Sequence, residues 1–94
     1  MGATSARHAR DIIANTRRIV AIEFLTAAQA LELRQEQPSP ATGAAHGTIR
    51  KQVPPLGGDR PLYGDIETIT TLICNGDILA AVEETIGPLQ APTD

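Results

Sequence analysis

The stretch ATSARHARDIIANTRRIVAIEFLTAAQALELRQ, residues 3–35, contains neither glycine nor proline and consists almost entirely of helix-forming residues. A helix of this length extends about 50 Å, at about 1.5 Å per residue. A compact domain of about 100 residues has a radius of gyration of only about 13 Å. We therefore predict one helix over residues 4–35, with Thr4 or Ser5 as its N-cap, that is longer than the body available to pack against it.

Apolar side chains are distributed over more than one side of this predicted helix. Ile12 and Ile19 share one side, and Ile22 and Leu33 share another. A helix that is apolar all round is normally buried. Because the rest of the chain is too short to cover it, we expect the chain to be part of a larger protein or one subunit of an obligate assembly. A third side carries Ile13, Phe24 and Leu31.

The segment Gln-Pro-Ser-Pro at 37–40 ends the long helix and begins the next one. Proline cannot continue a helix and disfavours helical geometry in the residue before it. Ser39 and the proline that follows are typical of an N-cap and a first helical residue, which predicts a second helix over residues 40–53. Gly43 and Gly47 each cost this helix about 1 kcal/mol relative to alanine. We expect either a neighbouring helix that approaches closely there or a segment ordered only by packing.

Turn-forming residues at 54–61 connect this helix to a third one. We predict the third helix over residues 66–74, with Asp65 as its N-cap. Its many β-branched residues are also typical of a strand, but the strict alternation of a half-buried strand is absent. The residues spaced as one helical face are Ile66, Ile69, Thr70 and Ile73.

A fourth helix is predicted over residues 78–86. Asn75–Gly76 is typical of a left-handed C-terminal cap for the third helix, and Asp77 is the expected N-cap of the fourth. Gly87–Pro88 ends it. The sequence thus predicts an all-α fold in which one long bundle helix is followed by three short helices.

Composition excludes several function classes. The net charge of −3 argues against nucleic-acid binding, which usually requires a basic surface. No apolar run approaches the roughly 20 residues of a membrane span. The single cysteine excludes an internal disulfide, so we expect a cytoplasmic protein. Four arginines on the long helix are interpreted as a solvated or intersubunit face, with a phosphate-binding stripe as the alternative: Arg7, Arg10, Arg17 and Arg18.

No catalytic, cofactor-binding or metal-binding residue is predicted. His8 and His46 lie on different predicted helices, without the spacing of a metal site. Cys74 is predicted to be buried and inert, because the C-terminal end of a helix disfavours a thiolate. An acid–base pair could be drawn from the residues around the third helix, but helix capping and a loop salt bridge explain them without any chemistry. Those residues are Asp59, Arg60, Asp65 and Glu67, and Glu83–Glu84 is interpreted as a solvated face.

Three segments together resemble the C-terminal part of the histidine ammonia-lyases, in the family of aromatic amino-acid ammonia-lyases and aminomutases. The first is MGATSAR at 1–7, and the second is EFLTAAQALELR at 23–34. The third combines VPPL at 53–56 with DRPLYGDI at 59–66. The resemblance extends from Met1 to about residue 84.

The resemblance implies a mostly helical homotetramer with a central bundle of long helices, and a role in histidine catabolism. Family members eliminate ammonia with a methylidene-imidazolone electrophile formed from an internal Ala-Ser-Gly, and the histidine enzymes yield urocanate. This chain contains no Ala-Ser-Gly, and no catalytic residue of the family maps onto it. Only Met1–Ser5 would border the active site. The electrophile would therefore be formed elsewhere in a full-length protein.

The leading hypothesis is a structural and oligomerisation segment of a histidine ammonia-lyase-like enzyme, inactive alone. Its expected partners are a second copy, through the long helix, or the remainder of the lyase. The alternative is a stand-alone helical homo-oligomeric interaction protein; a third is a small enzyme using Asp65, Glu67 or a histidine. The sequence leaves open whether the substrate is of the histidine, tyrosine or phenylalanine type. It also leaves open whether the parent enzyme is a lyase or an aminomutase. Three origins also stay open: an expressed fragment, a split gene or an internal start at Met1.

Overall fold

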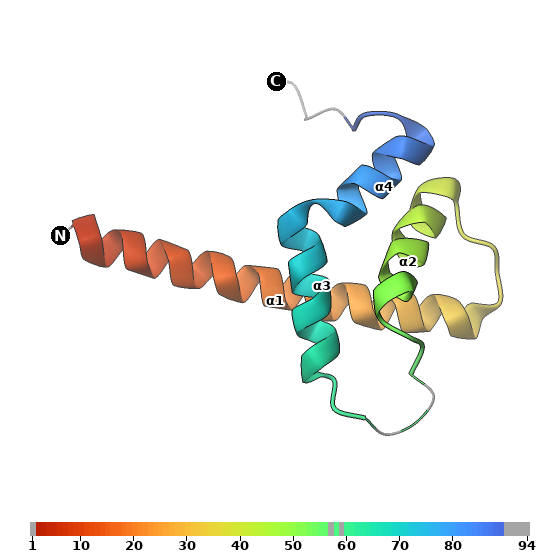
Figure 1. The fold of residues 1–94 in the computed structure, drawn as a ribbon, viewed down its shortest axis with the longest axis horizontal. Coiled ribbons are helices and arrows are strands. Elements are labelled where there is room, and N and C mark those ends of the chain that lie inside the picture. Colours follow the sequence, from red (N-terminus) through yellow and green to blue (C-terminus); the bar gives the residue numbers. More distant parts are fainter. Residues whose placement is uncertain (1, 57, 59, 90–94) are drawn as a thin grey trace.

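The computed structural model describes residues 2–56, 58 and 60–89, which form four helices (Figure 1). Within these residues no segment is a β-strand, so the predicted all-α fold is confirmed, including one long helix followed by three shorter ones. The helices are α1 (Gly2–Arg34), α2 (Pro40–Gln52), α3 (Tyr63–Asn75) and α4 (Asp77–Ile86).

The first and last residues of the long helix α1, Gly2 and Arg34, lie near the predicted bounds of 4 and 35. The prediction that Thr4 or Ser5 caps it was wrong, because the helix is already formed at Gly2 and the absence of a breaker lets it extend to there. It ends at Arg34, and the next residue, Gln35, has a left-handed φ of 59°. The chain therefore turns away from the helix axis before the two prolines.

The predicted start of α2 is confirmed. Ser39 is the N-cap, and its Oγ accepts a hydrogen bond of 3.3 Å from the backbone N–H of Thr42. Of the two alternatives for its glycines, a closely approaching helix is not found. A Cβ on Gly43 would meet only the Pro38 ring at 3.7 Å, and one on Gly47 would meet nothing within 4 Å. The helix is instead held by packing near its C-terminal end.

Gly47→Ala should therefore stabilise the chain by about 0.5–1 kcal/mol, because alanine is the better helix former and the added methyl group fits without a clash. Urea denaturation of the two proteins at equal concentration measures the shift. A lower midpoint for the alanine variant would show that another segment does approach α2 at this position.

The connection between α3 and α4 is made by one glycine. Gly76 has φ 75° and donates its backbone N–H toward Ile73 and Leu72, which confirms the left-handed cap. Two predicted N-caps were wrong. Helix α3 begins at Tyr63 rather than after Asp65, whose carboxylate binds an arginine, and Asp77 is the first residue of α4 rather than its cap.

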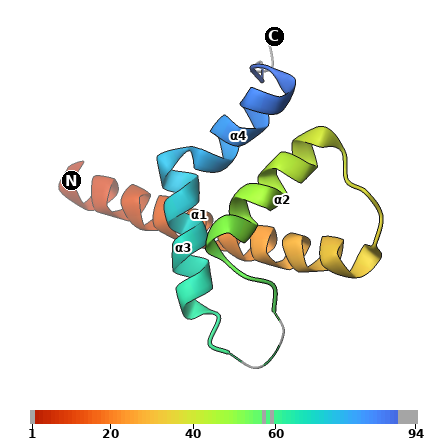
Figure 2. The same ribbon diagram turned by 45° about the vertical axis from the view of Figure 1, so that its right-hand side comes forward.

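The core lies where α3 crosses α1 and where α2 runs beside α4 (Figures 1 and 2). Ile49, Val53 and Ile69 are the largest fully buried side chains. Phe24 and Leu25 of α1 pack against this cluster. The other buried members are Ala21, Ala28, Leu72 and Ile78.

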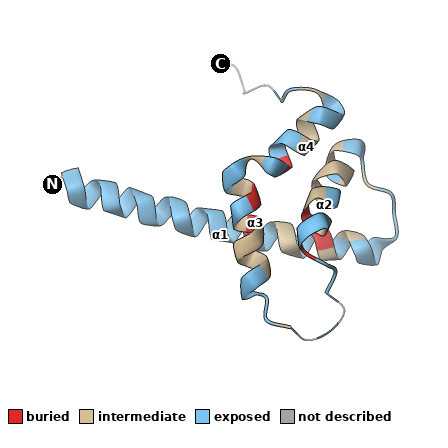
Figure 3. Cartoon of the chain, in the orientation of Figure 1, coloured by how far each residue is buried: buried red, intermediate tan, exposed pale blue. Residues whose placement is uncertain are grey.

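The N-terminal half of α1 projects from the body, and we call residues 2–19 the arm (Figure 3). Every residue of the arm is exposed. Ile12 and Ile19 are each 57% exposed, and Ile13 is 52% exposed. The three short helices thus cover only the C-terminal half of α1. The radius of gyration is 15.5 Å, above the value of about 13 Å for a compact chain of this size.

Candidate functional site

The described residues of the connector between α2 and α3 are contacted by side chains of α1, α2 and the connector itself. Gln29 Oε1 on α1 accepts a hydrogen bond of 3.1 Å from the backbone N–H of Leu56. Arg60 donates to the carbonyl oxygens of Pro54 at 2.7 Å and Pro55 at 3.2 Å. Arg50 of α2 donates to the Pro54 oxygen as well, at 3.5 Å. These contacts satisfy carbonyl groups that no regular secondary structure satisfies.

Arg60 also binds Asp65, at the start of α3. Its Nη2 lies 2.9 Å and its Nε 3.1 Å from Asp65 Oδ2. The Asp65 side chain is only 17% exposed. A carboxylate held in this way is engaged in a charge-assisted contact and is not poised as a general acid or base. The loop salt bridge that the sequence offered as the alternative is thus found, with Asp65 as its acidic member.

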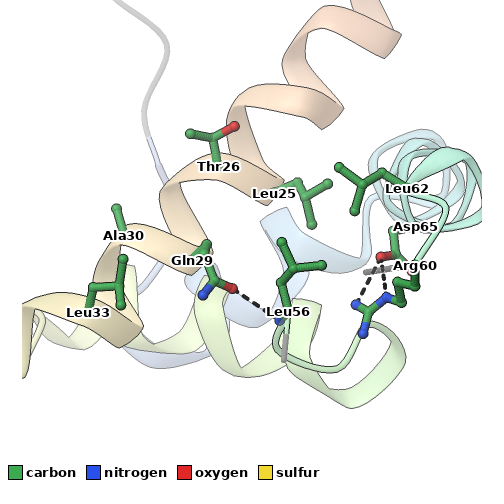
Figure 4. Close-up of a pocket in the computed structure, with 9 residues that line it drawn as sticks. All are labelled: Leu25, Thr26, Gln29, Ala30, Leu33, Leu56, Arg60, Leu62 and Asp65. Atoms are coloured by element: carbon green, nitrogen blue, oxygen red, sulfur yellow. Dashed lines mark hydrogen bonds and ion pairs between the residues drawn. The ribbon is translucent and has the colours of Figure 1, made fainter. Parts of the chain in front are cut away.

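A groove of about 350 Å³ lies between α1, the connector and α3 (Figure 4). Its polar side chains are already engaged: Gln29 accepts the backbone N–H of Leu56 and Arg60 binds Asp65, as the dashed lines in Figure 4 show. The hydroxyl of Thr26, which also lines the groove, donates to the carbonyl oxygen of Ile22. The groove therefore offers mainly apolar surface, and it fits an apolar side chain better than a polar substrate. Its apolar lining comes from Leu25, Ala30, Leu33, Leu56 and Leu62.

A second polar cluster joins the end of α1 to α2. Glu32 Oε1 lies 3.2 Å from Arg50 Nε and 2.9 Å from His46 Nε2. The hydrogen bond from Arg50 is the main cause that lowers the pKa of Glu32; desolvation opposes it, and the His46 charge adds to it. His46 Nε2 is buried and makes no hydrogen bond of good geometry, despite its short distance to Glu32. This cluster is a clasp between two helices.

The lowered pKa of Glu32 predicts a specific pH dependence. A carboxyl group whose pKa falls on folding contributes stability above its ordinary value near 4.5, and that stability is lost as the pH falls through the lowered pKa. Between about pH 5 and pH 3, the wild-type chain should lose stability more steeply than Glu32→Gln. Thermal unfolding across this range measures both slopes.

Glu23→Gln is the matched control, because Glu23 is an exposed carboxylate on the same helix and forms no ion pair within the described residues. It should follow the wild-type slope. Parallel curves for the wild type and Glu32→Gln would show that the clasp does not form in solution.

The remaining candidate residues are dispersed. Cys74 is exposed, so the prediction of a buried cysteine was wrong; it lies outside the α3 face that carries Ile69 into the core. Glu67 pairs with Arg18 at 3.3 Å, which ties one of the four arginines of α1 to α3. His8 lies on the exposed arm. Asp59 and Gly57 lie outside the described residues.

The contacts of Gln29 and Arg50 with the connector, and the clasp between α1 and α2, were not predicted from the sequence. Gln29 and Arg50 act on partners 18 to 27 residues away in the chain. Local spacing carries no signal for such contacts, and a glutamine or an arginine on a helix surface normally suggests only a solvated face.

Neither a metal site nor a membrane-spanning helix is present among residues 2–56, 58 and 60–89. No group of three or more histidine, cysteine, aspartate or glutamate side chains there could hold a metal ion. Among the helices that the structure describes, none combines the length and the apolar character needed to cross a membrane.

Comparison with known proteins gives a consistent family. Residues 1–51 match the family model described as aromatic amino acid lyase. A histidine ammonia-lyase from Symbiobacterium thermophilum is 55% identical over 91 residues, and one from Sorangium cellulosum is 49% identical over 90 residues. These alignments cover 96% and 95% of this chain but only 18% of each relative.

A relative with a different printed activity is similar as well. A MIO-dependent tyrosine 2,3-aminomutase from Streptomyces globisporus is 40% identical over 84 residues, covering 87% of this chain and 16% of that protein. No solved structure matches the chain.

Proposed function

This chain belongs to the aromatic amino acid lyase family, and we propose that it acts as the C-terminal structural and oligomerisation segment of a histidine ammonia-lyase-like enzyme. The parent reaction would be the elimination of ammonia from L-histidine to give urocanate, in the cytoplasm. We propose that this segment has no catalytic activity of its own.

The observation that carries this proposal is the length of the match. The chain spans about 18% of the curated relatives with which it aligns, while the alignment takes in nearly all of the chain. The Ala-Ser-Gly from which the family's electrophile is formed is absent from the sequence. The acidic groups in the first turns of α3, Asp65 and Glu67, are both held in ion pairs with arginines. These facts support a structural role rather than a catalytic one.

The arm supports the oligomerisation role. Ile12 and Ile19 form a stripe on one side of the arm and are each 57% exposed. Beyond the arm, Ile22 and Leu33 lie on an adjoining side of α1 and are 45% and 76% exposed. A stripe of this length fits a second long helix, either in another copy or in the remainder of the lyase.

The catalytic part of the proposal is tested by incubating the purified chain with L-histidine and following urocanate absorbance. The Symbiobacterium thermophilum relative, assayed under the same conditions, is the positive control. We expect no turnover above the protein-free blank, because covalent catalysis is lost without its electrophile. Because one relative is a tyrosine aminomutase, a second assay uses L-tyrosine. Conversion of either amino acid by the chain alone would contradict the proposal.

A second candidate is a stand-alone helical interaction protein that forms a homo-oligomer. The observation in its favour is that the three short helices build a closed core on α1 without any other segment. Co-expression with the remaining part of a related lyase separates the two candidates. Restored lyase activity supports the first candidate, and a homo-oligomer that ignores the lyase part supports the second.

A further inference from the structure

Arg50 of α2 carries a charge that is largely removed from solvent, because its side chain is only 12% exposed. Its Nε lies 3.2 Å from Glu32 Oε1 on α1. Within the described residues, Glu32 is the only carboxylate that pairs with Arg50. A buried cation without an opposite charge is costly, so the charge of Glu32 is what keeps the guanidinium group inside.

The rest of this guanidinium group faces the connector. Nη1 of Arg50 donates to the carbonyl oxygens of Val53 at 3.3 Å and Pro54 at 3.5 Å, directly after the last turn of α2. Nη2 donates to Gln29 Oε1 on α1 at 3.5 Å. These hydrogen bonds are long, but they all come from one planar charged group whose donors are fixed relative to one another. Arg50 therefore holds the beginning of the connector and the Gln29 amide at the same time.

The Gln29 amide connects Arg50 to the backbone of Leu56. Its Oε1 accepts the Leu56 N–H at 3.1 Å as well as the arginine donor. Since a guanidinium group can only donate, it favours the amide orientation in which the oxygen faces it, and the same oxygen then faces Leu56. Without the arginine, the amide is free to rotate and to present its NH₂ group, which cannot accept the Leu56 N–H.

Leu56 forms part of the wall of the groove between α1 and α3. Its side chain extends from the connector toward Leu25 of α1 (Figure 4). It is 42% exposed, and within the described residues its backbone N–H bonds only to Gln29. Packing therefore holds Leu56 weakly, and the position of this part of the wall depends on Gln29 and, through it, on Arg50.

Two other basic residues lie near this arrangement. His46 Nε2 is 2.9 Å from the same oxygen of Glu32, but it makes no hydrogen bond of good geometry. Arg60 binds the connector from the side of α3. Within the described residues, neither of the two bonds to Gln29. The contact between the charge of Glu32 and the Gln29 amide thus runs through Arg50.

We infer that Glu32, Arg50 and Gln29 form a latch that sets the wall of the groove. The charge of Glu32 keeps Arg50 inside, and Arg50 fixes the amide that bonds to Leu56. When Glu32 loses its charge, the guanidinium group is left without a counter-ion, moves to solvent and releases the amide. Arg50 is thus a positioning residue for the groove. The latch lies within a single copy of the chain and does not depend on the proposed lyase role.

Amide hydrogen exchange, followed residue by residue with NMR, tests the latch. The readout is the protection of the Leu56 N–H divided by that of Leu72, a core residue of α3 whose exchange reports the opening of the fold as a whole. Glu32→Gln removes the charge and keeps the shape of the side chain. The ratio should fall about fivefold, which corresponds to the loss of one hydrogen bond.

Arg50→Lys separates positioning from simple ion pairing. Lysine keeps the positive charge beside Glu32, but its ammonium group is a single point and cannot reach the carboxylate and the Gln29 amide together. The ratio should therefore fall as it does for Glu32→Gln, while the urea midpoint changes less. Lys51→Gln removes the neighbouring exposed cation of α2 and should leave both the ratio and the midpoint unchanged.

A ratio that stays at the wild-type value in either variant would overturn the latch. It would show that the contacts of Arg50 stabilise the fold as a whole and do not position the connector. Because Arg50→Lys retains the ion pair, it keeps the test decisive if Glu32→Gln fails to fold. The exchange ratio involves neither catalysis nor association, so the latch and the proposed function can fail independently.

Discussion

Replacing Ile69 by aspartate should lower the free energy of unfolding by about 4 kcal/mol, enough to unfold a marginally stable chain. Ile69 is 0% exposed and lies in the core beside Ala21 and Ala28 of α1. A carboxylate there would lose its hydration and find no cationic partner, and a large apolar contact would be lost as well. Urea denaturation at fixed protein concentration measures the change.

Thr71→Asp is the matched control for this variant. It introduces the same charge two residues away on the same helix, but Thr71 is exposed. Its effect should stay within about 0.5 kcal/mol. If Ile69→Asp unfolds at the wild-type midpoint, α3 does not pack on α1, and the chain would be one ordered helix with a loose tail.

The second large effect concerns association rather than folding. Ile12→Ser/Ile19→Ser should weaken self-association by about a hundredfold or more. Each isoleucine is 57% exposed in one copy, and completing its burial contributes on the order of 1 kcal/mol in each subunit. Analytical ultracentrifugation over a concentration series measures the dissociation constant.

Ala9→Ser is the control for the arm, since it adds a hydroxyl group to an exposed position without removing a large apolar side chain. It should leave the dissociation constant nearly unchanged. If the double serine variant associates as tightly as the wild type, the stripe of Ile12 and Ile19 is not the surface through which long helices pair.

Local sequence patterns predicted the elements of this fold well. The absence of glycine and proline predicted α1, and Ser39 with Pro40 predicted the start of α2. The spacing of Ile66, Ile69 and Ile73 predicted the face of α3 that packs in the core. These features depend on residues that are near one another in sequence, or on the simple need to bury apolar area.

Contacts between distant polar residues were not predictable in this way. Asp65 belongs to the residue types that commonly cap helices, but its carboxylate binds Arg60 instead. Helix α3 begins at Tyr63, two residues before Asp65. Cys74 is apolar by type, yet its place on α3 leaves it in solvent. Gln29 acts only because the fold brings the connector to it. Each outcome depends on the three-dimensional position of a partner, for which the local pattern holds no information.

By itself, this chain leaves the arm of its long helix uncovered, and we expect it to associate. Sedimentation equilibrium of the wild-type chain at micromolar concentration tests it most directly. We expect a mass that is a multiple of 9.9 kDa and rises with concentration until the assembly is complete. A single species of 9.9 kDa at all concentrations, with a sharp thermal transition, would contradict it.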